Sequence, residues 1–197
     1  MGFVEEPGRP AYDPEAARKA VEALKAEGVD MSIRILSTID PSVIRSTLLA
    51  VEMLREVGFE VELETELQED LIDRVLAGDF QSAAFRNQPG DDPDMNYVWW
   101  YGAGNPVNFA RFDDPVINEA LDKGRSEPDP EKRRSYYETI HKRMATEVYY
   151  SYQWYVPWAA VEARNVHGIL GPQLPSGDDP STRLANGHAV HGIWIDA

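Results

Sequence analysis

The sequence contains no cysteine, so disulfides, thiolate zinc ligands and a cysteine nucleophile are all excluded. It also lacks any run of about 18 consecutive apolar residues, which a membrane-spanning helix needs. Basic residues are scarce, since 19 Lys and Arg stand against 34 Asp and Glu and give a net charge of −15. This charge repels phosphate backbones and anionic lipids, which argues against binding to nucleic acids or to membrane surfaces.

The short motifs that mark common enzyme classes are missing as well. No G-x-S-x-G, Walker loop or G-x-G-x-x-G occurs. His188 and His191 form an H-x-x-H pair, but no carboxylate stands near them at a spacing typical of metal ligands. Asp91, Asp92 and Asp94 suggest paired carboxylates or a calcium site, yet they lack the EF-hand spacing, and an acidic turn beside proline is the simpler interpretation. We therefore predict no enzyme activity, no cofactor and no metal.

The first half of the chain alternates helical and strand-like patterns. These patterns follow one another over residues 14–27, 31–38, 41–57, 59–64, 67–77 and 79–85. An aspartate followed by proline, typical of a helix start, opens helices at Asp13, Asp40, Asp114 and Asp129. The alternation predicts an α/β sheet with crossover helices.

The loop after the third expected strand holds the candidate binding residues. Residues 85–109 combine Pro, Gly and acidic residues with the aromatic run Tyr97, Trp99, Trp100 and Tyr101. Ligands bind at the carboxyl ends of strands in open α/β sheets, so this position favours a binding role. Three of these rings share one helical face, which favours a packing role for part of the run. Both roles remain open at this point.

Two asparagines and a second aromatic segment extend the candidate surface. Asn105 and Asn108 lie in a Gly/Pro-rich loop, where they either form turns or hydrogen-bond a ligand. Residues 149–158 are aromatic and β-prone, which predicts a strand with one face in the core. Residues 165–197 are poorly periodic apart from a short apolar run at the end.

The order of these pieces resembles the C-terminal part of the family 5 extracellular solute-binding proteins, the peptide- and nickel-type receptors of ABC importers. The resemblance rests on the ordered set "YDPEAARKAVEALKAEG", "AVEMLREVGFEVELE", "LAGDFQSAAF", "DDPD", "NFARFDDPVINEALDKGR", "DPEKRRSYYETIHKRM" and "YYSYQWYVPWA", with a closing "VHGI". Together these pieces span about 190 residues. No single piece is diagnostic, but their order is specific.

The resemblance implies a periplasmic-binding-protein type II-like lobe, a mixed sheet flanked by helices. Residues 1–164 would form an α/β ligand-binding lobe of a larger two-lobe receptor, and residues 165–197 a tail that packs toward the other lobe. The function implied is binding of peptides or similar small polar solutes in an interlobe cleft, for delivery to an ABC permease. An extracytoplasmic location follows, with or without a lipid anchor. The isolated lobe is expected to self-associate, because it would expose apolar surface.

The resemblance also implies which residues face the cleft. In the oligopeptide receptors an acidic residue in this loop pairs with the peptide amine, but the matching position here is Pro89. Arg86 stands nearby, and its guanidinium suits a carboxylate or another polar group. The predicted ligand-binding residues are Arg86, Asn87, Gln88, Asp92, Tyr97, Trp99, Trp100, Asn105 and Asn108.

Two other functions are weighed against this prediction. One is a stand-alone α/β interaction module that holds a protein partner with its aromatic surface. The other is an acid/base hydrolase, which would need two carboxylates at a distance that sequence does not define.

Overall fold

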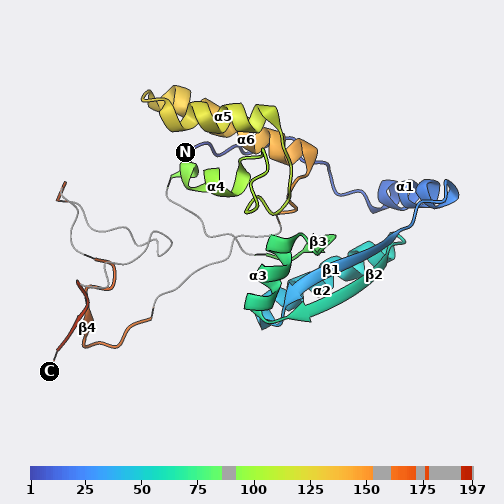
Figure 1. The fold of residues 1–197 in the computed structure, drawn as a ribbon, viewed down its shortest axis with the longest axis horizontal. Coiled ribbons are helices and arrows are strands. Elements are labelled where there is room, and N and C mark those ends of the chain that lie inside the picture. The colour runs from blue at the N-terminus through green and yellow to red at the C-terminus, as the bar shows by residue number, and fades with distance from the viewer. Residues whose placement is uncertain (86–91, 153–160, 172–175, 178–191, 197) are drawn as a thin grey trace.

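A computed structural model describes residues 1–85, 92–152, 161–171, 176–177 and 192–196. The predicted α/β alternation is confirmed (Figure 1). In chain order the elements are α1 (Pro14–Ala26), β1 (Ser32–Thr38), α2 (Pro41–Glu56), β2 (Glu60–Glu66), α3 (Gln68–Ala77), β3 (Ser82–Ala83), the 3-10 helix η1 (Pro93–Asn96), α4 (Tyr97–Trp100), α5 (Pro115–Ser126), α6 (Pro130–Glu147), β4 (Val166–His167) and β5 (Trp194–Ile195).

A three-stranded parallel sheet with strand order β2-β1-β3 organises the first half of the chain. The steps from β1 to β2 and from β2 to β3 run in opposite directions, so right-handed crossovers place α2 and α3 on opposite faces. We call α1–α3 with β1–β3 the sheet body. Against α2, Ile35 and Val61 are buried together with Val51. The expected third strand is shorter than predicted, because only two of its residues pair with β1.

The other face of the sheet carries charges that bind α3 to β2. Arg74 of α3 donates to Glu64 at 2.6 Å and to Asp79 at 2.9 Å, and it also contacts Glu66. The hydrogen bonds that Arg74 donates to these carboxylates, those to Glu64 and Glu66 most of all, raise the pKa of its guanidinium. The alternating sequence of β2 thus places valine and leucine on one face of the strand and glutamates on the other.

Helices α5 and α6 pack on each other and, with η1 and α4, form a second unit that we call the helical body (Figure 1). Its centre is fully buried and consists of Ile117, Leu121, Tyr137, Ile140 and Met144. The two helices approach closely because α5 has a glycine at the contact. A Cβ added at Gly124 would lie 2.9 Å from the Tyr137 ring.

The predicted helix starts are confirmed at all four aspartates. Asp13, Asp40, Asp114 and Asp129 each cap a helix whose first turn begins with proline, and each accepts a backbone N–H. A side-chain cap supplies a partner to an N–H group that the helix itself leaves unpaired. At the other end of α3, Gly78 adopts the left-handed conformation at φ 77°, which ends that helix as predicted.

The predicted strand over residues 149–158 is wrong for its described part. Residues 149–152 form no strand, and Val148 ends α6 in the left-handed conformation. Tyr149 stacks on Phe112 at 4.5 Å between ring centroids, and Tyr150 meets the same ring edge-on at 6.0 Å. Consecutive strand residues point to opposite faces, so two neighbours on one ring require a bend. Residues 153–160 lie outside the described chain.

The described parts of the C-terminal region contain a small antiparallel pair. β4 pairs with β5, and His167 stacks on Trp194 at 4.2 Å while its Nε2 lies 2.9 Å from the Asp196 carboxylate. The division at residue 165 and the packing of the tail toward another lobe stay predictions. Among the helices that the structure describes, none is both long enough and apolar enough to cross a bilayer.

Candidate functional site

The carboxyl ends of the three parallel strands lie at one edge of the sheet, and each strand is followed by an exposed apolar side chain. Ile39 after β1 is 56% exposed, Leu67 after β2 is 50% exposed, and Phe85 after β3 is 41% exposed. Parallel strands end at the same edge, which is where open α/β sheets bind ligands. Exposed apolar side chains in such a position are suited to line a ligand cleft.

An aromatic cluster stands at the end of β3. We use this name for Phe85, Trp99 and Phe109. The Phe85 and Phe109 rings meet edge-on at 5.1 Å between centroids, and Trp99 lies 5.7 Å from Phe109. The cluster joins three pieces of chain: the end of β3, helix α4 and the loop before α5. Trp99 was among the predicted ligand-binding residues, whereas Phe85 and Phe109 were not, although they stand at the two ends of the loop of residues 85–109.

Asp92, predicted as a ligand residue, holds the loop in place. Its carboxylate caps η1 by accepting the N–H of Asp94 at 2.9 Å. It also accepts two hydrogen bonds from Arg133, at 2.6 and 2.7 Å. The hydrogen bonds from Arg133 are the main cause of the lowered pKa of Asp92. Asp94 in turn pairs with Arg125 at 2.9 Å. Both carboxylates therefore have an arginine partner, which disfavours the acid/base hydrolase.

Tyr97 and Trp100 have structural contacts, in agreement with the shared helical face. Trp100 is buried in the core of the helical body. Tyr97 stacks on Tyr101 at 4.8 Å, and the Arg125 guanidinium lies 3.6 Å from its ring centroid. Its hydroxyl donates to Asp122 at 2.8 Å. Burial and this hydrogen bond raise the pKa of Tyr97 to about 12.

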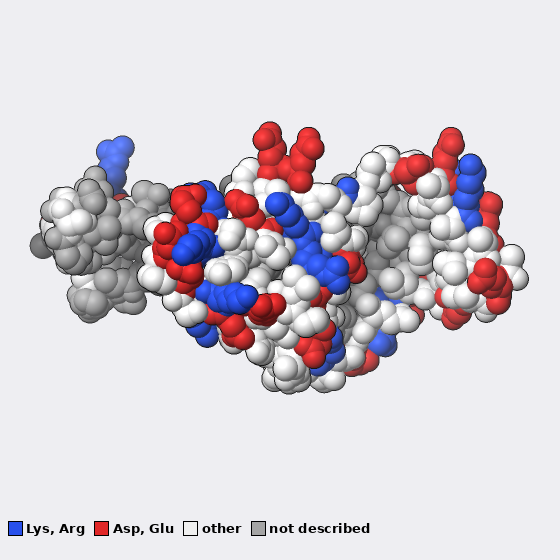
Figure 2. Space-filling view, turned by 90° about the horizontal axis from the view of Figure 1, so that it is seen from above, with Lys and Arg blue, Asp and Glu red and all other residues white. Residues whose placement is uncertain are grey.

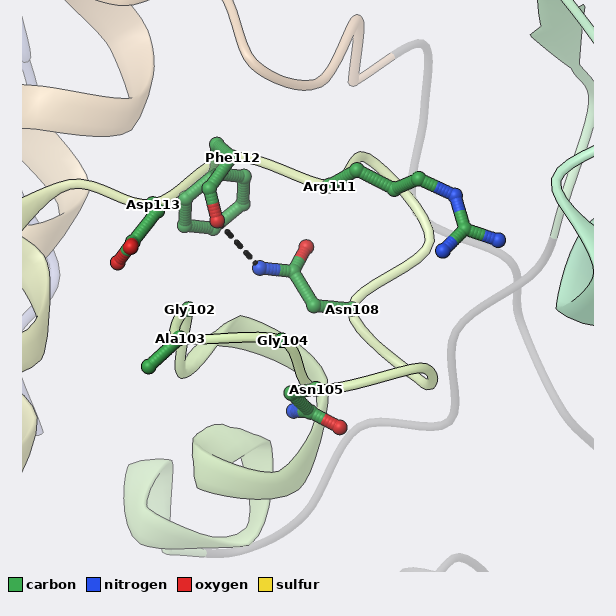
Figure 3. Close-up of a pocket in the computed structure, with 8 residues that line it drawn as sticks. All are labelled: Gly102, Ala103, Gly104, Asn105, Asn108, Arg111, Phe112 and Asp113. Carbon is green, nitrogen blue, oxygen red and sulfur yellow. Dashed lines mark hydrogen bonds between the residues drawn. The ribbon is translucent and has the colours of Figure 1, made fainter.

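A cavity of about 250 Å³ lies beside the asparagines (Figure 3). Its lining residues are Gly102, Ala103, Gly104, Asn105, Asn108, Arg111, Phe112 and Asp113. The Asn105 amide donates to the carbonyls of Val98 and Tyr101 at 2.7 and 3.0 Å. The Asn108 amide donates to the Phe112 carbonyl at 2.8 Å.

Asn108 is almost fully buried, and its Oδ1 has no hydrogen-bond partner. Because its Nδ2 meets a carbonyl, the amide orientation is fixed. Both asparagines thus organise the loop through their amide groups. Their predicted contact with a ligand stays a prediction.

The remaining predicted ligand residues, Arg86, Asn87 and Gln88, lie outside the described chain. So do His188 and His191. Across the ranges that the structure covers, no three His, Asp or Glu side chains gather as metal ligands would.

His141 packs edge-on against Trp100 at 6.3 Å, and burial lowers its pKa, so it is a neutral packing residue at pH 7. On the face shown in Figure 2, basic side chains lie among the acidic ones and form no separate basic patch within the described residues.

No protein-family model and no curated protein matches the sequence. Solved structures do match the fold. The oligopeptide-binding protein AppA of Bacillus subtilis, solved with a nonapeptide, has a TM-score of 0.71 at 16% identity and covers 100% of this chain and 40% of its own. A putative peptide-binding AppA of Clostridium difficile has a TM-score of 0.65 at 18% identity and covers 98% and 40%.

The ABC transporter substrate-binding protein CtaP of Listeria monocytogenes matches with a TM-score of 0.63 at 21% identity, over 75% of this chain and 30% of its own. The chain thus spans less than half the length of these three proteins. They are binding proteins rather than enzymes. The fold of this chain is therefore that of one part of a peptide-type ABC substrate-binding protein, as the order of its sequence motifs predicted.

Proposed function

We propose that this chain is the α/β lobe of an extracytoplasmic substrate-binding protein of an ABC importer, and that it binds peptides or similar small polar solutes. The aromatic cluster would form one wall of a cleft between this lobe and a second one. Closure of the two lobes would bury the ligand, so this lobe alone would bind weakly. Delivery to an ABC permease and packing of residues 165–197 toward the second lobe belong to the same proposal.

The observation that carries this proposal is the aromatic cluster at the carboxyl edge of the parallel sheet. Phe85 lies at the end of β3, and its ring partner Phe109 comes from a loop 24 positions further along the chain. Apolar walls with a few polar groups suit a cleft that accepts varied side chains. The structural neighbours agree, since they include complexes with a nonapeptide and with the dipeptide Met-Leu.

A nuclear magnetic resonance titration of this chain with a mixture of di- to nonapeptides tests the proposal. We expect millimolar peptide to shift the Trp99 indole signal and the amides beside Phe109 in a saturable way. Trp99→Ala should weaken this binding about fivefold, because loss of a large aromatic contact costs about 1 kcal/mol. Trp194→Ala is the matched control, since Trp194 is exposed on β5. Its loss should leave the peptide response unchanged.

Absence of any saturable shift at these residues would contradict the proposal. The interaction module gains support if a folded protein partner, rather than a peptide, shifts the same signals and Trp99→Ala abolishes that response.

Self-association is measured separately by light scattering. Three exposed apolar side chains of α2, Leu48, Leu49 and Met53, predict dimers at high concentration.

A further inference from the structure

Arg111 connects the helical body to the sheet body. Its Nη2 donates to the carbonyls of Val75 at 3.2 Å and Leu76 at 3.0 Å, in the last turn of α3. The Val75 carbonyl also accepts the N–H of Gly78 at 3.1 Å. Carbonyls of a final helical turn lack the i+4 partner of the helix interior, and the helix dipole makes this end attractive to a cation. Arg111 is one of the residues that line the cavity, and Figure 3 shows its guanidinium pointing away from the other lining residues.

The end of α3 is shaped to receive this side chain. A Cβ added at Gly78 would lie 2.8 Å from the Arg111 Nη2 and 3.1 Å from its Nε. Glycine therefore permits both the left-handed helix end and the close approach of the guanidinium. Arg111 itself has a positive φ of 54°, which is unfavourable for a residue with a side chain. Contacts of the side chain must offset this backbone conformation.

The two segments that the Arg111 hydrogen bonds join, residues 108–111 and the end of α3, each lie close in sequence to one phenylalanine of the aromatic cluster. On one side, Arg111 follows Phe109 by two positions, and its N–H donates to the Asn108 carbonyl at 2.9 Å, which closes a tight turn. On the other side, α3 continues through Gly78 into β3 and Phe85. Fixing Arg111 on α3 thus limits how far Phe109 moves relative to Phe85.

We propose that Arg111 is a positioning residue that holds Phe109 against Phe85 by anchoring the loop of residues 108–111 to the end of α3. This residue keeps the aromatic wall assembled before a ligand arrives. The role in ligand affinity rests on the proposed function, whereas the role in ring geometry does not. Preorganisation of this kind increases affinity because less freedom is lost on binding.

Ring-to-ring nuclear Overhauser effects between Phe85 and Phe109 test the proposal without any ligand. Arg111→Ala should reduce their intensity several-fold, while contacts between β1 and β2 persist. Arg111→Lys should restore part of the intensity, since an ammonium still reaches a carbonyl. Arg111→Gly relieves the positive φ but should lose the ring contact like the alanine variant. Arg18→Ala, at an exposed position of α1, is the matched control.

Gly78→Ala disturbs the same contact from the side of α3 and provides an independent variant if Arg111→Ala does not fold. Unchanged Phe85–Phe109 effects in Arg111→Ala would overturn the proposal. Peptide affinity is the second measurement, and we expect it to fall about tenfold in Arg111→Ala. Loss of the ring contact in a protein whose unsubstituted form binds no peptide would support the positioning role while contradicting the proposed function.

Discussion

Replacing Asp114 by alanine tests how the helical body supports the site. This carboxylate is 2% exposed and accepts four hydrogen bonds, from the backbone of Val116 and Ile117 and from the side chains of Arg143 and Tyr149. Loss of the cap costs about 1 kcal/mol. Leaving Tyr149 and Arg143 without their acceptor adds about 1–3 kcal/mol, toward the lower end because Arg143 is partly exposed. We expect Asp114→Ala to lower the free energy of unfolding by about 2–4 kcal/mol.

Urea unfolding followed by tryptophan fluorescence measures this loss, and Asp129→Ala is the matched control. Asp129 caps α6 through two backbone N–H groups at 3.0 Å and also precedes a proline, but it lies on the surface. Its replacement should cost about 1 kcal/mol, the value of a cap alone. Equal losses in the two variants would refute the reasoning, because the ion pair and the tyrosine contact of Asp114 would then contribute nothing.

The pH dependence of the same variant gives a second check. Burial by itself would raise the pKa of Asp114, but hydrogen bonds from Arg143, Tyr149 and two backbone amides outweigh it and lower that pKa. A carboxyl whose pKa is lower in the folded state stabilises the protein above its unfolded pKa of about 3.9, and this contribution is lost as the pH falls through the folded pKa. The difference between wild type and Asp114→Ala should therefore shrink below about pH 4.

Two further predictions concern Tyr97 and the contact between α5 and α6. Burial and Asp122 raise the pKa of Tyr97 to about 12, and burial also raises the pKa of Tyr137, Tyr149 and Tyr150. Tyr97→Phe should therefore reduce the late phase of an ultraviolet tyrosine titration by one tyrosine, and an unchanged late phase would contradict this. Gly124→Ala should destabilise the protein by about 1–3 kcal/mol in urea unfolding, because the new methyl group collides with the Tyr137 ring. Gly192→Ala, where a Cβ meets nothing within 4 Å, is its control and should change stability by less than about 0.5 kcal/mol.

The sheet body was predictable because its signals are local. A capping aspartate and a proline in the first turn begin α1 and α2, and a glycine follows the end of each of α1, α2 and α3. These signals act within a few residues, so the limits of the three helices agree closely with the pattern. Strand periodicity likewise identified β1 and β2. β3 was overestimated, because the length of a paired strand depends on its neighbour rather than on its own sequence. The same limit explains the error at residues 149–152. There the rings of Tyr149 and Tyr150 both pack on Phe112, which requires a bend in the chain rather than a strand.

The candidate site was only partly predictable, because the sequence shows which side chains are able to contact a ligand but not which already have partners within the protein. Asp92 has the charge expected of a ligand anchor, yet Arg133, 41 positions away, accounts for two of its hydrogen bonds. Asn108 is polar and lies in a loop, yet it is buried. Conversely, Phe85 and Phe109 become neighbours only through the fold. Polar side chains of the loop that have hydrogen-bond partners within the protein stabilise the loop. The apolar rings that stay partly exposed at the carboxyl edge of the sheet are therefore the groups best placed to contact a ligand.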